Sequence, residues 1–193
     1  MSDTTSQVPD IKEGVHDYSP TDRYVWPESP ILREKLERFR DQKLAFMAHF
    51  GIYQQAGIVE SWALIDEDQS WSRNEIDWTH DVDQFKDSYV RLNRSFNPVR
   101  FQPEHWAKLA KENGFRYCIL TTKHHDGFCM WDTKTTNYKV TAEDCPFHEH
   151  PKADIIKEAF DAFRKEGLGI HAYFSKADWN CPYFWKPGYL HSF

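Results

Sequence analysis

The stretch from Arg116 to Asp132 constrains the fold of this chain more than any other part of its sequence. Its first half, 117–122 (YCILTT), is apolar and β-branched, which is typical of a short strand buried on both faces. Its second half begins with four ionisable residues and a glycine, 123–127 (KHHDG). Enzymes of the α/β class present their chemistry in this way, at the carboxyl ends of buried parallel strands. We therefore predict a functional corner directly after residue 122.

Two further apolar runs are predicted to be strands that also end in polar or aromatic residues. Residues 43–50 (KLAFMAHF) have His49 at their carboxyl end, and 168–174 (LGIHAYF) lead into the polar segment 175–179 (SKADW). Each of the three predicted strands is preceded by a predicted helix. The sequence thus repeats a βα pattern, which is typical of α/β folds.

Four helices are predicted from apolar residues that recur at three- and four-residue spacing. Ser29 supplies an N-cap for the first of them and Pro30 takes its first helical position. Residues 51–78 are predicted to be a long loop, and their aromatic content favours a functional role. The predicted helices span 30–41, 83–96, 103–113 and 153–166.

The fold class predicted from this pattern is α/β, with about three βα units. A (β/α)₈ TIM-like barrel needs about 250 residues and eight strands, and the chain has 193 residues. Two interpretations follow, a smaller α/β sheet or the amino-terminal portion of a barrel. Residues 1–28 are polar, carry three prolines and lack periodicity, so they are predicted to be an extended arm with partial disorder. Residues 29–193 are expected to form the folded domain.

Composition and charge argue against several classes of protein. The formal net charge is −6 and no stretch is strongly basic, which argues against nucleic-acid binding. No apolar run approaches the roughly 20 residues that cross a bilayer, and the first residues lack the apolar region of a signal peptide. The chain as written is therefore expected to be cytoplasmic. The four cysteines show no C-x-x-C spacing and are expected to be reduced thiols.

Histidines at predicted strand ends are the main candidates for chemistry. His124 and His125 follow the central strand and His49 ends the first, so all three are expected on one rim. A neutral imidazole offers one donor and one acceptor, which suits the hydroxyls of a sugar. Glu60 and Trp62, in the aromatic loop, can add a carboxylate and a stacking indole. The alternatives are structural: backbone capping for the histidines, a surface salt bridge for the carboxylate and a corner position for the indole.

A metal site is a competing interpretation of the same corner. A metal-dependent hydrolase would use His49, His124, His125 and Asp126, but such enzymes usually carry H-x-H at the first strand, which 48–50 (AHF) does not provide. The motifs of nucleotide binding, serine hydrolysis and zincins are also missing from the sequence. The preferred interpretation therefore includes no metal and no cofactor.

The sequence resembles the amino-terminal half of the α-L-fucosidases of glycoside hydrolase family 29. The resemblance covers roughly residues 43–182, and its pieces occur in the family's order at comparable spacing. The pieces are KLAFMAHFG, the ESW of the loop, WAKLAK, YCILTTKHHDGFCMWD and GLGIHAYFSKADW. The segment TTKHHDGF followed by tryptophan is highly specific to that family. The resemblance implies a (β/α)₈-like barrel and a retaining hydrolase that removes terminal α-L-fucose from glycans.

The resemblance also implies roles for particular residues. The family's histidines at these positions bind hydroxyls of the fucose ring, which carries over to His49, His124 and His125. The loop's carboxylate and indole contact the sugar, which matches Trp62 and Glu60. The order here is Glu-Ser-Trp, whereas many members have Glu and Trp adjacent.

At other positions this sequence differs from the family, and some of the family's residues are not matched by any residue of this chain. The aromatic residue at the end of the third strand corresponds to Tyr173 or Phe174, and Phe50 stands where the family usually has tryptophan. The family's nucleophile, an Asp after the fourth strand, and its acid/base are expected beyond Phe193, so the chain is expected to be a fragment without turnover of its own.

The partner that the resemblance implies is a fucosylated glycan. Neither a nucleic acid nor a membrane is expected as a partner. Self-association of the subunits is left open. The rival from another class is a fucose-binding module that keeps the sugar-contacting histidines and does not hydrolyse.

Overall fold

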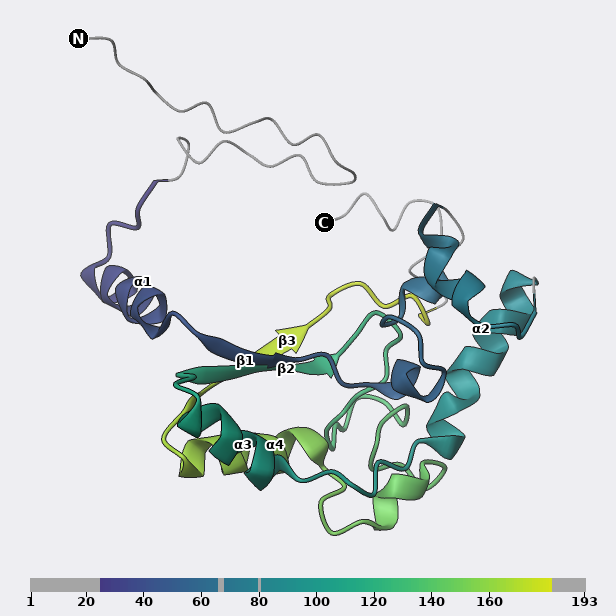
Figure 1. Cartoon of the computed structure of the whole chain (residues 1–193). Helices are drawn as coiled ribbons and strands as arrows, with labels where there is room; N and C mark the ends of the chain where they lie inside the picture. Colours follow the sequence, from purple (N-terminus) through teal and green to yellow (C-terminus); the bar gives the residue numbers. More distant parts are fainter. Residues whose placement is uncertain (1–24, 66–67, 80, 182–193) are drawn as a thin grey trace. The chain divides into compact units, whose positions relative to one another are not determined.

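A computed structural model of the chain describes residues 25–65, 68–79 and 81–181 (Figure 1). The chain divides into two compact units, Met1–Asp41 and Gln42–Phe193. The helix α1 (Pro30–Gln42) confirms the first predicted helix. Of the predicted arm 1–28, only 25–28 are among the described residues, and these form no helix or strand.

A three-stranded parallel sheet in the order β1-β2-β3 forms the centre of the second unit (Figure 1). In the register of the sheet, Ala48 lies opposite Leu120, and Tyr173 lies opposite Thr121. The carboxyl ends of all three strands therefore meet at one edge. The strands are β1 (Ala45–Ala48), β2 (Tyr117–Lys123) and β3 (Gly169–Phe174), which confirms the three predicted strands and the α/β class.

The central strand is buried and its neighbours are less so. Every residue of β2 is buried except Ile119, which is half-buried. Met47 of β1 and Phe174 of β3 are each 51% exposed. The central position of β2 explains why its sequence is a continuous apolar and β-branched run instead of an alternating one.

Two helices, α3 (Pro103–Glu112) and α4 (Ile155–Lys165), lie side by side and cover one face of the sheet (Figure 1). Phe46 of β1 packs against Trp106 of α3 and Phe163 of α4, with ring centroids 6.2 and 5.5 Å apart. Leu109 stands at an apolar position of the predicted helix 103–113 but is 48% exposed, because the buried stripe of α3 runs through small residues at the neighbouring positions 103, 107 and 110. Within the described residues, no helix combines the length and apolarity that a membrane span requires.

Two other predictions about the chain are corrected by the structure. The predicted helix 83–96 is α-helical only over α2 (Val82–Val90), and Arg91–Ser95 form a 3-10 helix. Pro98 follows shortly after, and proline disfavours helical backbone before it, so the last turn tightens and ends. The predicted loop 51–78 contains three 3-10 helices, Ile52–Gln55, Trp62–Leu64 and Asp68–Glu75.

The turn after β2 is fixed by Asp126 and Gly127. The Asp126 carboxylate is buried and accepts hydrogen bonds from the Phe128 backbone N–H and the Tyr89 hydroxyl of α2, both at 2.9 Å. Burial raises the pKa of Asp126 to about 6, although these two hydrogen bonds act in the opposite direction. Gly127 has a φ of +81°, and a Cβ there would lie 2.8 Å from an oxygen of Asp178.

The raised pKa of Asp126 predicts a pH-dependent difference between the wild type and Asp126→Asn. Above pH 6 the carboxyl is ionised in both states and the folded state bears the cost of burying the charge. As the pH falls from 6 toward 4, the folded protein takes up the proton first and the cost is relieved. The free energy of unfolding of the wild type should rise relative to that of Asp126→Asn by about 2 kcal/mol between pH 7 and pH 4. Urea unfolding of both proteins at pH 7 and pH 4 measures this difference in unfolding free energy. A difference that does not change with pH would contradict the prediction.

The backbone at Gly127 predicts that Gly127→Ala destabilises more than Gly114→Ala. Both glycines have positive φ, but nothing lies within 4 Å of a Cβ at Gly114. Each variant loses about 1–2 kcal/mol through the left-handed backbone, and Gly127→Ala loses a further 1–3 kcal/mol or so through the clash. Asp178 cannot move away without cost, because it accepts hydrogen bonds from the N–H groups of residues 180 and 181. Equal losses of unfolding free energy in the two variants, measured by urea unfolding, would contradict a clash at Gly127.

Candidate functional site

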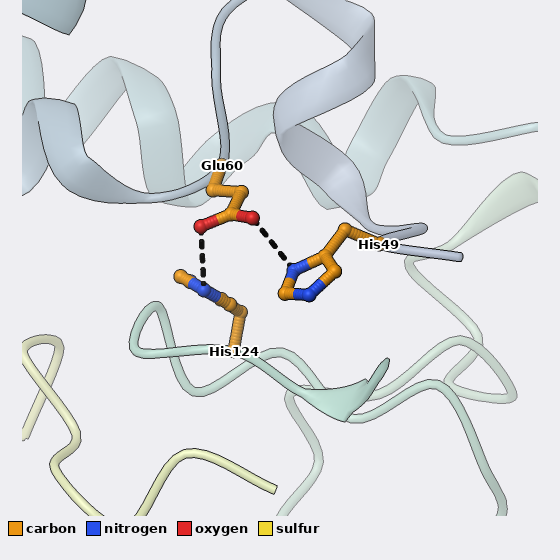
Figure 2. A group of neighbouring side chains, drawn as sticks. All are labelled: His49, Glu60 and His124. Carbon is orange, nitrogen blue, oxygen red and sulfur yellow. Dashed lines mark ion pairs between the residues drawn. The ribbon is translucent and has the colours of Figure 1, made fainter. Parts of the chain in front are cut away.

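The carboxylate of Glu60 lies between two imidazoles at the carboxyl edge of the sheet (Figure 2). Its Oε1 is 2.7 Å from Nδ1 of His49, which follows β1, and its Oε2 is 3.1 Å from Nε2 of His124, which follows β2. The indole N–H of Trp62 donates a hydrogen bond of 2.8 Å to Oε2. One carboxylate thus joins residues from two strand ends and from the loop between them.

The backbone of Glu60 is in the left-handed region, with a φ of +53°. This conformation is unfavourable for a residue with a Cβ, by an amount on the order of 1 kcal/mol. It accompanies the sharp change of chain direction before the 3-10 helix that begins at Trp62. Strained backbone of this kind is concentrated at functional sites, where the surrounding structure holds it in place. The backbone at Glu60 is therefore held in place by the contacts of its surroundings.

His124 is buried and its ring is held on several sides. Its side chain is 1% exposed, and its Nδ1 forms a hydrogen bond with the hydroxyl of Ser61. Its ring lies parallel to that of Tyr173, with centroids 6.0 Å apart. Burial, together with the nearby His125, His49 and Lys123, lowers the pKa of His124 to about 3. The imidazole is therefore neutral at neutral pH.

Two ring nitrogens in this group make no hydrogen bond with any described residue. They are Nδ1 of His49 and Nε2 of His124, and both atoms are buried. Each lies close to an oxygen of Glu60, but the directions required for a hydrogen bond are not met. A buried polar atom without a partner is costly. These two nitrogens therefore lie against the Glu60 carboxylate with their hydrogen-bonding capacity unused.

His125 belongs to an aromatic stack beside the carboxylate. Its ring lies against that of Trp179, with centroids 4.0 Å apart and planes at 15°. Trp62 contacts both, at 5.9 Å from the His125 ring and 5.4 Å from Trp179. Nδ1 of His125 lies 3.1 Å from the carbonyl oxygen of Ala177 and donates to it, and burial lowers the pKa of this histidine. The stack provides an apolar wall next to the polar group around Glu60.

Lys123, the last residue of β2, ties the corner to the segment after β3. Its side chain is buried, and its Nζ donates to the carbonyl oxygens of His124 at 3.2 Å and Ala177 at 3.4 Å. The ammonium also lies 4.9 Å from the centroid of the Phe174 ring. Lys123 therefore holds in place the segment that carries Trp179.

The structure brings together all the residues predicted to bind substrate, and their role in binding stays a prediction. Of the two candidates at the end of β3, Tyr173 joins the group, with its ring 4.8 Å from that of His49, whereas Phe174 faces Lys123 and Trp131. The grouped residues are His49, Glu60, Trp62, His124, His125 and Tyr173.

The donor set of the metal interpretation is not brought together. Asp126 binds Tyr89 and Phe128, and Nδ1 of His125 binds a backbone carbonyl. Among the described residues, the group of three or more histidine, cysteine, aspartate or glutamate side chains whose donor atoms lie within 4.8 Å of one another consists of His49, Glu60 and His124.

Three residues that form part of this site were not assigned to it from the sequence. Ser61 lies between the two loop residues that were singled out, yet its contact with His124 depends on the turn at Glu60. Lys123 carried one signal, a charged residue at the end of a buried strand. Trp179 lies in the polar segment 175–179 that follows the third predicted strand, and nothing in its spacing shows that it stacks on His125.

Comparison with known proteins finds relatives of this chain in one family. The model of the alpha-L-fucosidase family matches residues 15–192. A putative alpha-L-fucosidase of Caenorhabditis elegans is 29% identical over 157 residues, which are 78% of this chain and 30% of the relative.

Solved structures agree with this assignment. Alpha-L-fucosidase isoenzyme 1 of Paenibacillus thiaminolyticus is 34% identical, with a TM-score of 0.61 over 78% of this chain and 30% of its own. An alpha-L-fucosidase GH29 of Bacteroides thetaiotaomicron is 33% identical, with a TM-score of 0.58 over 81% of this chain and 32% of its own. The chain spans about a third of the length of these relatives. Because the family model matches most of the sequence, the chain belongs to the alpha-L-fucosidase family.

Proposed function

We propose that this chain forms the sugar-binding part of a retaining α-L-fucosidase, which removes terminal α-L-fucose from glycans. In this proposal the three βα units are the amino-terminal portion of a (β/α)₈-like catalytic barrel. Family membership supports the proposal, and so does the position of the site at the carboxyl edge of a parallel sheet, where barrels of this kind hold their active sites. The related Bacteroides thetaiotaomicron enzyme has been trapped as a covalent intermediate in complex with 2-fluoro-fucosyl fluoride.

The observation that carries the proposal is the pairing of one carboxylate with two unpartnered imidazole nitrogens. Sugar hydroxyls both donate and accept, so one hydroxyl can donate to Glu60 while another meets Nε2 of His124 or Nδ1 of His49. The rings of Trp62 and Tyr173 lie beside these polar groups and can cover the C–H surface of the sugar. The burial of His124 keeps these contacts away from competing water.

The roles of nucleophile and acid/base are not assigned to any described carboxylate. A retaining glycosidase needs two carboxyl groups about 5–5.5 Å apart, one of them facing the anomeric carbon. Glu60 receives the Trp62 indole N–H and contacts two imidazoles, which suits hydroxyl binding. Asp126 is enclosed by Tyr89 and the backbone of its own turn. We therefore assign Glu60 to binding and Asp126 to the structure of the corner.

The proposal predicts saturable binding of L-fucose that depends on Glu60 and His49. Each of the variants Glu60→Gln and His49→Ala removes a strong polar contact and should weaken binding by about 10- to 100-fold. The exposed His105→Gln on α3 is the control and should bind as the wild type does. Isothermal titration calorimetry of the 193-residue chain measures all of these affinities.

Sugar specificity and turnover complete this test. L-Rhamnose, a deoxyhexose with a different arrangement of hydroxyls, should bind more weakly than L-fucose. No saturable binding of L-fucose, or equal binding by the wild type and Glu60→Gln, would contradict the proposal. Turnover of an aryl α-L-fucoside by the same chain would show that a carboxylate within it is the nucleophile, against the roles given above.

A further inference from the structure

We propose that His49, Glu60 and His124 also form a binding site for a divalent transition-metal ion, best suited to Zn²⁺, and that the bound ion excludes the sugar. The three donors lie together in Figure 2. The metal site is argued from their geometry alone. Only the competition with the sugar rests on the proposed function.

The spacing of the donor atoms fits a small cation. His49, Glu60 and His124 each offer one donor atom that lies within 4.8 Å of the other two, and the N···O separations from His49 to Oε1 and from His124 to Oε2 of Glu60 are 2.7 and 3.1 Å. Ligand atoms about 2.0–2.1 Å from a tetrahedral Zn²⁺ lie roughly 3.3 Å from each other. The two N···O separations lie within about 0.6 Å of this value, and donor atoms as far apart as 4.8 Å would approach by up to about 1.5 Å to complete the coordination shell.

The two nitrogens have no competing partner among the described residues. Nδ1 of His49 and Nε2 of His124 are both buried without a hydrogen bond, and the His124 side chain is 1% exposed and directed at the Glu60 carboxylate. When Nδ1 of His124 donates to Ser61, its Nε2 lone pair faces a carboxylate oxygen, which is an unfavourable arrangement. A cation between the two atoms turns this repulsion into attraction.

Neighbouring groups already hold the donors in orientation. Metal-bound histidines almost always use their second ring nitrogen for a hydrogen bond, and Ser61 supplies it for His124. Trp62 holds the carboxylate of Glu60 through its indole N–H. The ring of Tyr173 lies 4.8 Å from that of His49 and restricts its rotation. The side chains of His49, Glu60 and His124 are thus already held close to the orientation in which they would bind an ion.

The donor set selects the class of ion and leaves access for it. Two imidazole nitrogens and one carboxylate suit Zn²⁺, Co²⁺ or Cu²⁺, whereas Mg²⁺ and Ca²⁺ prefer shells of oxygen. The side chains of His49 and Glu60 are 23% and 21% exposed, so an ion can enter from that side. Three protein ligands leave a fourth tetrahedral position open to water.

The shared residues make the ion and the sugar mutually exclusive. An ion on the two imidazole nitrogens occupies the positions assigned above to sugar hydroxyls. It also neutralises the carboxylate that accepts from them. Zn²⁺ should therefore raise the apparent Kd of L-fucose by a factor of one plus the ratio of the free Zn²⁺ concentration to the Kd of the metal site.

The test is a titration of the chelator-treated 193-residue chain with Zn²⁺ by calorimetry and with Co²⁺ by visible absorption. The wild type should bind one ion at this site, with the absorption of tetrahedral Co²⁺. His49→Ala and Glu60→Gln should each weaken binding by about 10- to 100-fold or more. His105→Gln is the matched control, since it removes an exposed histidine and should leave the affinity unchanged. His49 is chosen over His124 because its side chain is more exposed, so truncation disturbs folding less.

The results separate the two proposals. Affinity for Zn²⁺ that is equal in the wild type, His49→Ala and Glu60→Gln would overturn the metal site, and so would a thiolate-to-Co²⁺ absorption band in place of nitrogen and oxygen ligation. L-Fucose binding that is unaffected by saturating Zn²⁺ would overturn the competition. Zn²⁺ binding without any L-fucose binding would support the metal site while contradicting the proposed function.

Discussion

The parallel pairing of β2 with both neighbouring strands is the constraint on which the rest of the structure depends. It places the residues that follow β1, β2 and β3 at one edge, so side chains distant in sequence become neighbours. The helices α3 and α4 cover one face of the sheet and stabilise it through the contacts of Phe46. Without this register, His49 and His124 would not approach a common carboxylate.

The parts of the fold that follow from sequence are those in which local pattern and tertiary structure agree. The three strands were predicted because buried parallel strands are short apolar runs, and polar residues directly after them mark the functional edge. His49, His124 and His125 were placed at this edge for that reason. Helix ends were less predictable, because apolar spacing continues past Val90 while the backbone tightens ahead of Pro98.

The centre of the site could not be predicted from spacing. Glu60 reaches both imidazoles because its backbone has positive φ and because 3-10 helices flank its turn, and neither feature has a sequence signature for a glutamate. The contact of Ser61 with His124 depends on the same turn. The resemblance to a family indicated that a carboxylate belongs here, although the order Glu-Ser-Trp departs from the adjacent Glu and Trp of many members. The structure shows that this order still delivers a carboxylate to the strand ends.

The wide sequence separation of the paired strands has a consequence for how the chain folds. The threonine hydroxyls of β2 that bond to the carbonyls of Ala48 and Tyr173 join residues 73 and 51 positions apart. Such contacts form only after long segments have closed, whereas helices form locally within microseconds. We therefore expect the helices to appear early and the ring of side chains around Glu60 to assemble last. Ligand binding would then report that the newly made polypeptide has completed its folding.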